Sequence, residues 1–141
     1  MLTKKTKYAI HALTFLAKKD KTTPQLIAII SEETHTPRKF LETILLELKK
    51  NGILGSKMGK GGGYYLRKDP EKIKLSTILR LFDGAIAYVP CASLNYYEKC
   101  DECDDEINCG LHHIMVDVRD ETLKLLENKT IQDILNKEVR V

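Results

Sequence analysis

The sequence predicts a mainly helical protein with one small β-hairpin and a long helix near its C-terminal end. Three observations indicate this fold class. Apolar side chains recur with helical spacing along most of the chain. One glycine-rich stretch is flanked by short extended segments. All four cysteines lie in a single segment just before the last long helical pattern.

A first helix is predicted from about residue 3 to residue 19. Its apolar face consists of Tyr8, Ala12, Phe15 and Leu16. Three lysines lie near its start, Lys4, Lys5 and Lys7. Because cations oppose the dipole of a helix start, while the free N–H groups there favour an anion, this pattern favours a bound phosphate, with Lys5, Lys7 and Tyr8 as its expected contacts. Solvated lysines are the alternative.

Two threonine–proline pairs predict the starts of the next two helices. Thr22-Thr23-Pro24 precedes a short helix that fades near Ser31, and Thr36-Pro37 precedes a helix that ends at Asn51-Gly52. Two such helices joined by a tight turn match a helix-turn-helix, whose second helix enters the DNA major groove. The expected contacts are Thr36, Arg38, Lys39 and Glu42. For Glu42, an ordinary exposed charge is the alternative.

A β-hairpin is predicted next, because Ile53-Leu54 and Tyr64–Leu66 flank the glycine-rich run GSKMGKGGG. The run is not a nucleotide-binding P-loop, since no Gly-Lys-Ser/Thr sequence opens a helix here. Directly after a helix-turn-helix, such a hairpin is a wing that lies against DNA. Lys57, Lys60 and Gly61 are its expected contacts, with a flexible surface loop as the alternative reading.

The second half of the chain predicts three more helices, over 75–82, 111–128 and 130–136. The long one carries an apolar stripe that a single helix beyond a small domain cannot bury by itself. Pairing with a second copy about a twofold axis would bury it. We therefore expect a DNA-binding domain over 1–84, a cysteine-rich sensor loop over 85–110, and a dimerisation helix followed by a C-terminal short helix over 111–141.

Charge divides the chain in the same way. Residues 1–68 hold 14 Lys or Arg and five Asp or Glu, a balance of +9, whereas residues 69–141 hold nine and 15, a balance of −6. A strongly basic half is typical of a nucleic-acid binder.

Several functional classes find no support in the sequence. No apolar run approaches the roughly 20 residues that cross a bilayer, and the N-terminus has no secretory signal pattern. We therefore expect a cytoplasmic protein without a membrane partner, in which cysteines bind metal or act in redox chemistry rather than form structural disulfides. No nucleophile–base or acid–base pair indicates an enzyme.

The cysteine segment predicts a metal or iron–sulfur site. Eight residues separate Cys91 from Cys100, two separate Cys100 from Cys103, five separate Cys103 from Cys109, and two separate Cys109 from His112. Six acids between positions 98 and 106 disfavour free thiolates, and a bound cation reverses that effect. Thiolates with an imidazole suit zinc or an iron–sulfur cluster. The doublets Cys100/Cys103 and Cys109/His112 make zinc a serious alternative to a cluster on spacing alone.

The chain resembles the IscR-like, or Rrf-two, family of winged helix-turn-helix regulators over nearly its whole length. The resemblance rests on LTKKTKYAIHAL, FLETILLELKKNGIL, GKGGGYYL and NKTIQDILNKEV. It implies a dimeric transcription regulator with an iron–sulfur cluster in the loop before the dimerisation helix. The implied ligands are Cys91, Cys103, Cys109 and His112.

The sequence departs from the family pattern in two places. The gap between Cys91 and Cys103 is longer by six residues and contains Cys100, an alternative ligand. The resemblance favours a 2Fe–2S cluster, while four cysteines would also permit 4Fe–4S. Met58 replaces the wing arginine of cluster-biogenesis regulators, which implies a different target sequence. The remaining histidines, His11, His35 and His113, match no ligand position.

We therefore expect a homodimeric transcription regulator that binds double-stranded DNA with an affinity set by an iron–sulfur cluster. A zinc-binding or thiol-based regulator of the same fold is the first alternative. An iron–sulfur electron-transfer or carrier protein is the second, although it leaves the wing without a role.

Overall fold

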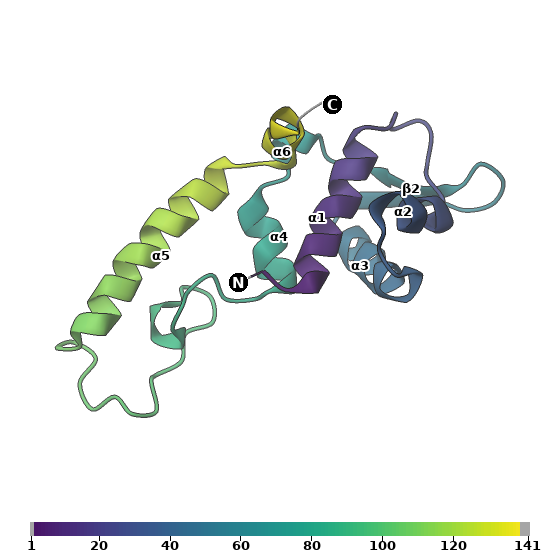
Figure 1. Ribbon diagram of the computed structural model, residues 1–141. Coiled ribbons are helices and arrows are strands. Elements are labelled where there is room, and N and C mark those ends of the chain that lie inside the picture. Colours follow the sequence, from purple (N-terminus) through teal and green to yellow (C-terminus); the bar gives the residue numbers. More distant parts are fainter. Residues whose placement is uncertain (1, 139–141) are drawn as a thin grey trace.

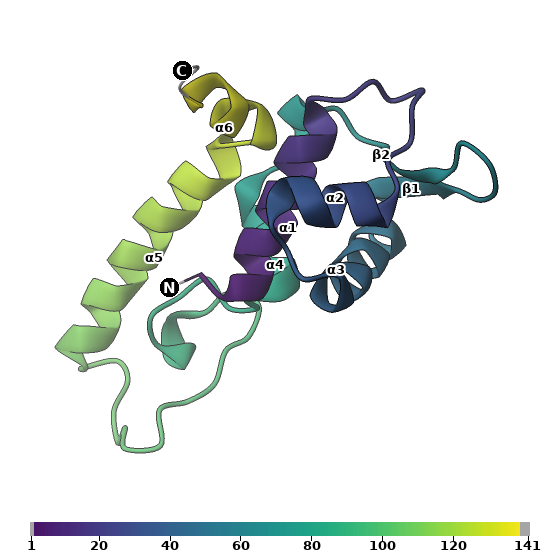
Figure 2. The same ribbon diagram turned by 45° about the vertical axis from the view of Figure 1, so that its right-hand side comes forward.

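The structure is a computed structural model that describes residues 2–138 (Figures 1 and 2). It is mainly helical with one two-stranded antiparallel sheet, which confirms the predicted fold class. The helices are α1 (Lys4–Ala17), α2 (Ile27–Thr34), α3 (Arg38–Lys50), α4 (Leu75–Phe82), α5 (Gly110–Asn128) and α6 (Ile131–Lys137). The strands are β1 (Leu54–Lys57) and β2 (Gly63–Leu66), and short 3₁₀ turns cover Pro70–Lys72 and Pro90–Ala92.

The core surrounds α1, which contacts α2, α3, α4 and α6. Leu13 of α1 meets Leu45 of α3 and Ile78 of α4 in one cluster of fully buried side chains. The short helix α6 joins the same cluster through Ile131, far along the chain. Backbone hydrogen bonds fix that return, since the Ile131 N–H donates to the Ile73 carbonyl over 3.1 Å. The C-terminal helix thus packs with the N-terminal half.

The start of α2 differs from the prediction. The helix begins at Ile27 and not after Thr22-Thr23-Pro24, and it continues through Ser31 to Thr34. The reason is tertiary, because Gln25 pairs with Tyr64 of β2 through two backbone hydrogen bonds of 2.8 Å. That pairing requires extended backbone where the sequence signal predicts the first helical turn.

A glycine makes this pairing sterically feasible. Gly63 has a φ of +137°, and a Cβ atom there would lie 2.3 Å from the Gln25 carbonyl oxygen. Only a residue without a side chain allows the two backbones to approach so closely. The hairpin itself pairs Leu54 with Leu66 and Lys57 with Gly63, so its glycine-rich turn projects from the body beyond β1 and β2 (Figure 2).

Helix α5 extends away from the core and is joined to α4 by the loop over residues 83–109 (Figure 1). Along α5, Leu123 is the buried residue. Three apolar side chains of its stripe, Leu111, Ile114 and Leu125, are 62%, 57% and 62% exposed. The predicted unburied stripe is therefore present. No helix within residues 2–138 has the length and apolar character needed to cross a membrane.

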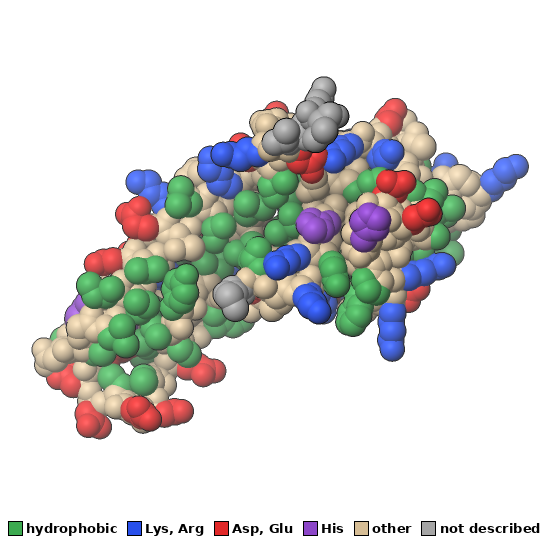
Figure 3. All heavy atoms as spheres, viewed as in Figure 1, with side chains coloured by type: hydrophobic (Ala, Val, Ile, Leu, Met, Phe, Trp, Pro, Cys, Tyr) green, Lys and Arg blue, Asp and Glu red, His purple; other side chains and the backbone are tan. Residues whose placement is uncertain are grey.

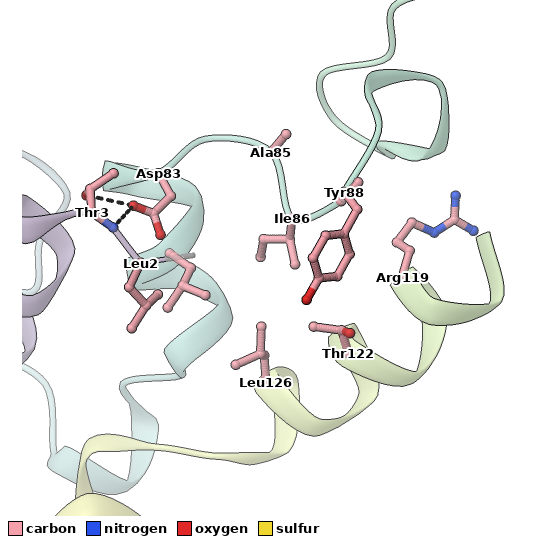
Figure 4. Close-up of a pocket in the computed structure, with 11 residues that line it drawn as sticks. Leu2, Thr3, Asp83, Ala85, Ile86, Tyr88, Arg119, Thr122 and Leu126 are labelled. Atoms are coloured by element: carbon pink, nitrogen blue, oxygen red, sulfur yellow. Dashed lines mark hydrogen bonds between the residues drawn. The ribbon is translucent and has the colours of Figure 1, made fainter. Parts of the chain in front are cut away.

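An open hollow of about 320 Å³ lies between α5, the end of α4 and the N-terminus (Figure 4). At one side, Asp83 accepts hydrogen bonds from the Thr3 hydroxyl at 2.8 Å and the Thr6 hydroxyl at 2.5 Å. These bonds tie the start of α1 to the end of α4. Leu126 and Tyr88 project into the other side, so the inner face of α5 is also incompletely covered.

Candidate metal centre and nucleic-acid interface

The cysteine loop folds around one hollow of about 660 Å³ at the start of α5. All four thiols line it, and so do one imidazole and six carboxylates. The potential ligands among these residues are Cys91, Cys100, Cys103, Glu106, Cys109 and His112. Thiolates and an imidazole are the donors that zinc and iron–sulfur clusters use, so the composition of the hollow fits either group.

Three of these side chains converge on one point. His112 Nδ1 lies 3.3 Å from Cys91 Sγ and 3.5 Å from Glu106 Oε1. The ligand atoms of Cys91, Glu106 and His112 all lie within 4.8 Å of one another. Among the described residues, no other group of three or more His, Cys, Asp or Glu side chains brings its ligand atoms this close together.

Helix α5 positions two of the candidate ligands. Cys109 caps the helix, and its sulfur accepts a hydrogen bond of 3.4 Å from the His112 backbone N–H. A side chain at this capping position satisfies one of the free N–H groups of the helix start. His112 follows in the first turn, and its side chain therefore points to the same end of the helix as Cys109.

Cys91 comes from the 3₁₀ turn Pro90–Ala92, which is itself fastened to α5. Arg119 Nη1 donates a 2.8 Å hydrogen bond to the carbonyl of Ala92. At the other end of the loop, His113 Nε2 donates to the Ile107 carbonyl over 2.6 Å. Both sides of the hollow are therefore anchored to one helix.

The electrostatics of the hollow disfavour free thiolates. Burial, followed by the charges of Glu106 and Cys100, raises the pKa of Cys91. Burial and the neighbouring charges of Cys109 and Cys100 raise the pKa of Cys103. Reactive cysteines have a lowered pKa, so these thiols are poor nucleophiles until a cation offsets the negative charge.

A tyrosine orients the carboxylate of the converging group. The Tyr97 hydroxyl donates to Glu106 Oε2 over 2.9 Å and lies 3.1 Å from Oε1. This hydrogen bond raises the pKa of Tyr97. Glu106 therefore has a fixed position between Tyr97 and His112.

The structure brings together some predicted ligands more closely than others. Cys91 and His112 meet directly, while Cys103 and Cys109 line the same hollow outside the converging group. The extra thiol, Cys100, is exposed, but it lies close enough for its negative charge to contribute to the raised pKa of Cys91 and Cys103. The zinc doublets expected from spacing, Cys100/Cys103 and Cys109/His112, are not the group that converges.

Glu106 was missed in the sequence, where nothing distinguishes it from the five other acids of the segment. The remaining histidines lie elsewhere. His113 bonds to the backbone of Ile107, and His11 and His35 line a separate hollow between α1, the end of α2 and α6.

The predicted DNA contacts of α3 and the hairpin lie at the opposite end of the molecule from the acidic loop (Figure 1). Figure 3 shows acidic side chains gathered around the loop, and lysines and arginines projecting from the end with α3 and the hairpin. Most of the predicted contact residues are exposed: Lys5, Lys7, Arg38, Lys39, Glu42, Lys57, Lys60 and Gly61. Tyr8 is half-buried against the exposed ring of Phe40. Met58, beside the wing lysines, is 92% exposed.

Thr36 differs from the other predicted contacts because it is only 2% exposed. Its hydroxyl accepts a 3.0 Å hydrogen bond from the Thr34 hydroxyl, and its carbonyl accepts one of 2.6 Å from Ser31. The side chain therefore closes the turn between α2 and α3 and is not available at the surface for DNA.

The sequence model of the Rrf2 family, described as iron-dependent transcriptional regulators, matches residues 2–137. The chain is 40% identical over 138 residues to an Rrf2-like regulator of Rhodobacter capsulatus, covering 96% of this chain and 92% of that protein. It is 30% identical over 135 residues to the regulator IscR of Enterobacter, covering 96% and 79%.

A solved structure shares the fold. CymR, the global cysteine regulator of B. subtilis, matches with a TM-score of 0.79 at 22% identity, covering 99% of this chain and 98% of that chain. The sequence relatives are transcriptional regulators and not enzymes. This chain therefore belongs to the Rrf2 family of winged-helix transcriptional regulators.

Proposed function

We propose that this regulator is a homodimer that binds double-stranded DNA in the cytoplasm and senses an iron–sulfur cluster in its cysteine loop. One observation carries the proposal: Cys109 caps α5 and His112 lies in the first turn of the same helix. A cluster on these side chains would be attached directly to the helix that we expect to pair the two subunits.

The proposed cluster ligands are Cys91, Cys103, Cys109 and His112, with Cys100 as an alternative. Their shared hollow at the start of α5 supports this set. Three thiolates and an imidazole suit a 2Fe–2S cluster, and four thiolates would suit 4Fe–4S. When bound, the cluster would supply positive charge and a chemistry that responds to iron supply and oxidation.

The dimer would form through the exposed apolar stripe of α5. Leu111, Ile114 and Leu125 each leave more than half of their surface in water. Apolar side chains exposed in a row on one helix favour association, and burial stabilises by about 25 cal/mol per Å² of apolar surface. The same helix of a second copy is a self-complementary partner under twofold symmetry.

The proposed DNA interface uses α3, the start of α1 and the hairpin. Arg38, Lys39 and Glu42 lie at the start of α3, where a recognition helix reads base edges. The DNA backbone or the minor groove would be contacted by two further sets of residues. These are Lys5, Lys7 and Tyr8 of α1, and Lys57, Lys60 and Gly61 of the wing. We omit Thr36 from this set because its side chain is buried.

The cluster would act on DNA binding through α5. Cys91 moves with the turn that Arg119 fastens to α5, and Cys109 and His112 belong to the start of that helix. A dimer binds two half-sites about one DNA turn apart. A small change in the orientation of the paired helices would therefore change how both recognition helices fit the DNA.

The test compares cluster-loaded and apo protein prepared without oxygen. Fluorescence anisotropy with a DNA fragment selected from the genome would measure the affinity of each form. We expect the DNA affinities of the two forms to differ by more than tenfold, about 1.4 kcal/mol. The Cys109→Ser variant should bind DNA with the affinity of the apo protein. Equal affinities of the two forms would contradict cluster sensing, whereas no binding at low salt would contradict the DNA-binding role.

A thiol-based regulator is the second candidate, favoured by the solvent exposure of Cys100 and its position three residues before Cys103. The raised pKa of Cys91 and Cys103 argues against it, because thiol sensors depend on thiolates. Treatment of apo protein with peroxide separates the two ideas. A thiol sensor would change its DNA affinity on oxidation and recover with dithiothreitol, even when Cys109 is replaced by serine.

A further inference from the structure

We infer that the loop also holds a mononuclear metal site, in which Cys91 Sγ, a Glu106 oxygen and His112 Nδ1 bind one divalent transition-metal ion. The site shares Cys91 and His112 with the proposed cluster set but adds a carboxylate ligand and requires no sulfide. It does not depend on whether the loop ever binds a cluster.

Two of the three distances between the ligand atoms already suit one ion, and the third, between Cys91 Sγ and the Glu106 carboxylate, is within 4.8 Å. Tetrahedral zinc with bonds of about 2.3 Å to sulfur and about 2.0–2.1 Å to nitrogen or oxygen keeps its ligand atoms about 3.3–3.6 Å apart. His112 Nδ1 lies 3.3 Å from Cys91 Sγ and 3.5 Å from Glu106 Oε1. His112 therefore already lies at a suitable distance from both other ligands, and an ion would draw Cys91 and Glu106 toward a common centre.

Three different parts of the fold hold these ligands in place. Cys91 lies in the 3₁₀ turn that Arg119 fastens to α5, and His112 is fixed in the first turn of that helix. Glu106 receives the Tyr97 hydroxyl, which acts as an outer-shell partner that fixes the carboxylate. Such partners orient ligands and strengthen metal binding.

Charge and burial also favour an ion at this point. A thiolate and a carboxylate together balance a charge of +2, and a neutral imidazole completes the set. The side chains of His112 and Glu106 are only 17% and 29% exposed. An ion bound there would be partly shielded from water and would remove the repulsion between Cys91 and Glu106.

The ligand types select the class of ion. Thiolate and imidazole favour zinc, iron(II) or cobalt(II) over magnesium and calcium, which prefer oxygen ligands. Three protein ligands leave a fourth position open for water or for the thiolate of Cys109, which lines the same hollow. The site therefore has the composition of an exchangeable transition-metal site.

The experiment titrates reduced, sulfide-free full-length protein with cobalt(II) and follows the absorption of the thiolate–cobalt bond. Zinc has no visible absorption, so its affinity is measured by its displacement of cobalt. We expect one ion per chain. Glu106→Gln keeps the shape of the side chain but removes its negative charge. It should weaken cobalt binding by about tenfold or more. Tyr97→Phe should weaken binding less, because it removes only the hydrogen bond to Glu106.

Two variants serve as matched controls. Glu102→Gln removes one negative charge from the same hollow without removing a proposed ligand, and Cys103→Ser removes a proposed cluster ligand that lies outside the converging group. Both should keep an affinity close to that of the unaltered protein. Equal weakening by Glu106→Gln and Glu102→Gln would overturn the site, as would loss of binding in Cys103→Ser.

The outcome is separable from that of the cluster proposal. Iron and sulfide content after cluster reconstitution measures the cluster alone, while cobalt absorption without sulfide measures the mononuclear ion. Cys103→Ser should lose the cluster and keep the cobalt site. If the unaltered protein assembled no cluster but still bound cobalt through Glu106, the cluster proposal would fail and this inference would stand.

Discussion

The two regions of this protein differ in what completes their folding. Helices α1–α4, the hairpin and α6 share a core in which Leu13, Leu45 and Ile131 are fully buried. In the loop and α5, the described buried apolar side chains are Ala92 and Leu123. Large apolar side chains there are instead exposed, such as Ile107 at 81% and Leu111 at 62%.

This difference shows that the first region is stabilised by its own core, whereas the second has unburied apolar surface and converging ligand atoms. Burial of apolar surface is the main favourable term in folding. A region with little buried apolar surface needs further contacts to become rigid. We expect these contacts to come from a bound metal ion or cluster and from a second subunit. That incompleteness would make the second region responsive to its ligand.

The largest expected effect is a core truncation in the first region. Leu45→Ala should destabilise the protein by about 2–5 kcal/mol, because it leaves a cavity at a fully buried site. Leu125→Ala, at a site that is 62% exposed, should change the free energy of unfolding of the monomer by less than about 0.5 kcal/mol. Urea unfolding of dilute protein measures both, and equal losses would contradict the division into two regions.

The next largest effect concerns the second subunit. Ile114→Asp places a charge on the exposed stripe of α5 and should convert a dimer into a monomer in analytical ultracentrifugation. DNA affinity should fall by about 10²-fold or more, because two linked half-site contacts become independent. Lys124→Gln is the control, because Lys124 is exposed and lies about 100° around the helix from the stripe, and it should leave both properties unchanged. A dimeric Ile114→Asp protein would show that another surface pairs the subunits.

A smaller effect is expected where the second region returns to the first. Thr130 caps α6, and its backbone N–H donates to Asp133 Oδ2 over 2.8 Å in a reciprocal capping box. Thr130→Ala should cost about 1 kcal/mol of stability. Gln132→Ala, in the same helix, should cost less, since the side chain of Gln132 donates a hydrogen bond to the exposed Asn136 and caps no helix end. Thermal unfolding of the two variants makes the comparison.

The smallest effect concerns one phosphate contact of the wing. Lys60→Ala should lower DNA affinity modestly for every sequence and reduce the slope of log affinity against log salt by about 0.9 per subunit, or about 1.8 for the dimer. Lys124→Ala, on α5 away from the proposed interface, should leave the slope unchanged. Titrations at several salt concentrations give both slopes. An unchanged slope for Lys60→Ala would place the wing away from the DNA backbone.

Local sequence signals predicted most of the elements. The buried stripe predicted for α3 comprised Phe40, Leu41, Ile44, Leu45 and Leu48. The last four are buried, whereas Phe40 is 58% exposed, so the prediction was wrong for that residue. The glycine-rich run between short extended segments predicted the hairpin. The start of α2 was predicted wrongly, because pairing of Gln25 with Tyr64 outweighs a local threonine–proline signal. A contact with a residue distant in sequence leaves no trace in local spacing.

The candidate site was predictable in part. The clustering of four cysteines and His112 pointed to the loop, and the loop does fold around one hollow. Glu106 could not be selected among six nearby acids, since its distinction is the contact with Tyr97 and His112. Thr36 was expected at the DNA surface, but the tight turn after α2 buries it.

The sequence by itself determined the helical class, the hairpin, the separation of basic and acidic halves and the segment that carries the ligands. These features depend on local periodicity, composition and spacing. Only the tertiary structure decided that α6 joins the N-terminal core, that Gln25 extends the sheet, and that Cys91, Glu106 and His112 converge. Those outcomes depend on contacts between residues far apart in the chain, which form only when the whole chain packs.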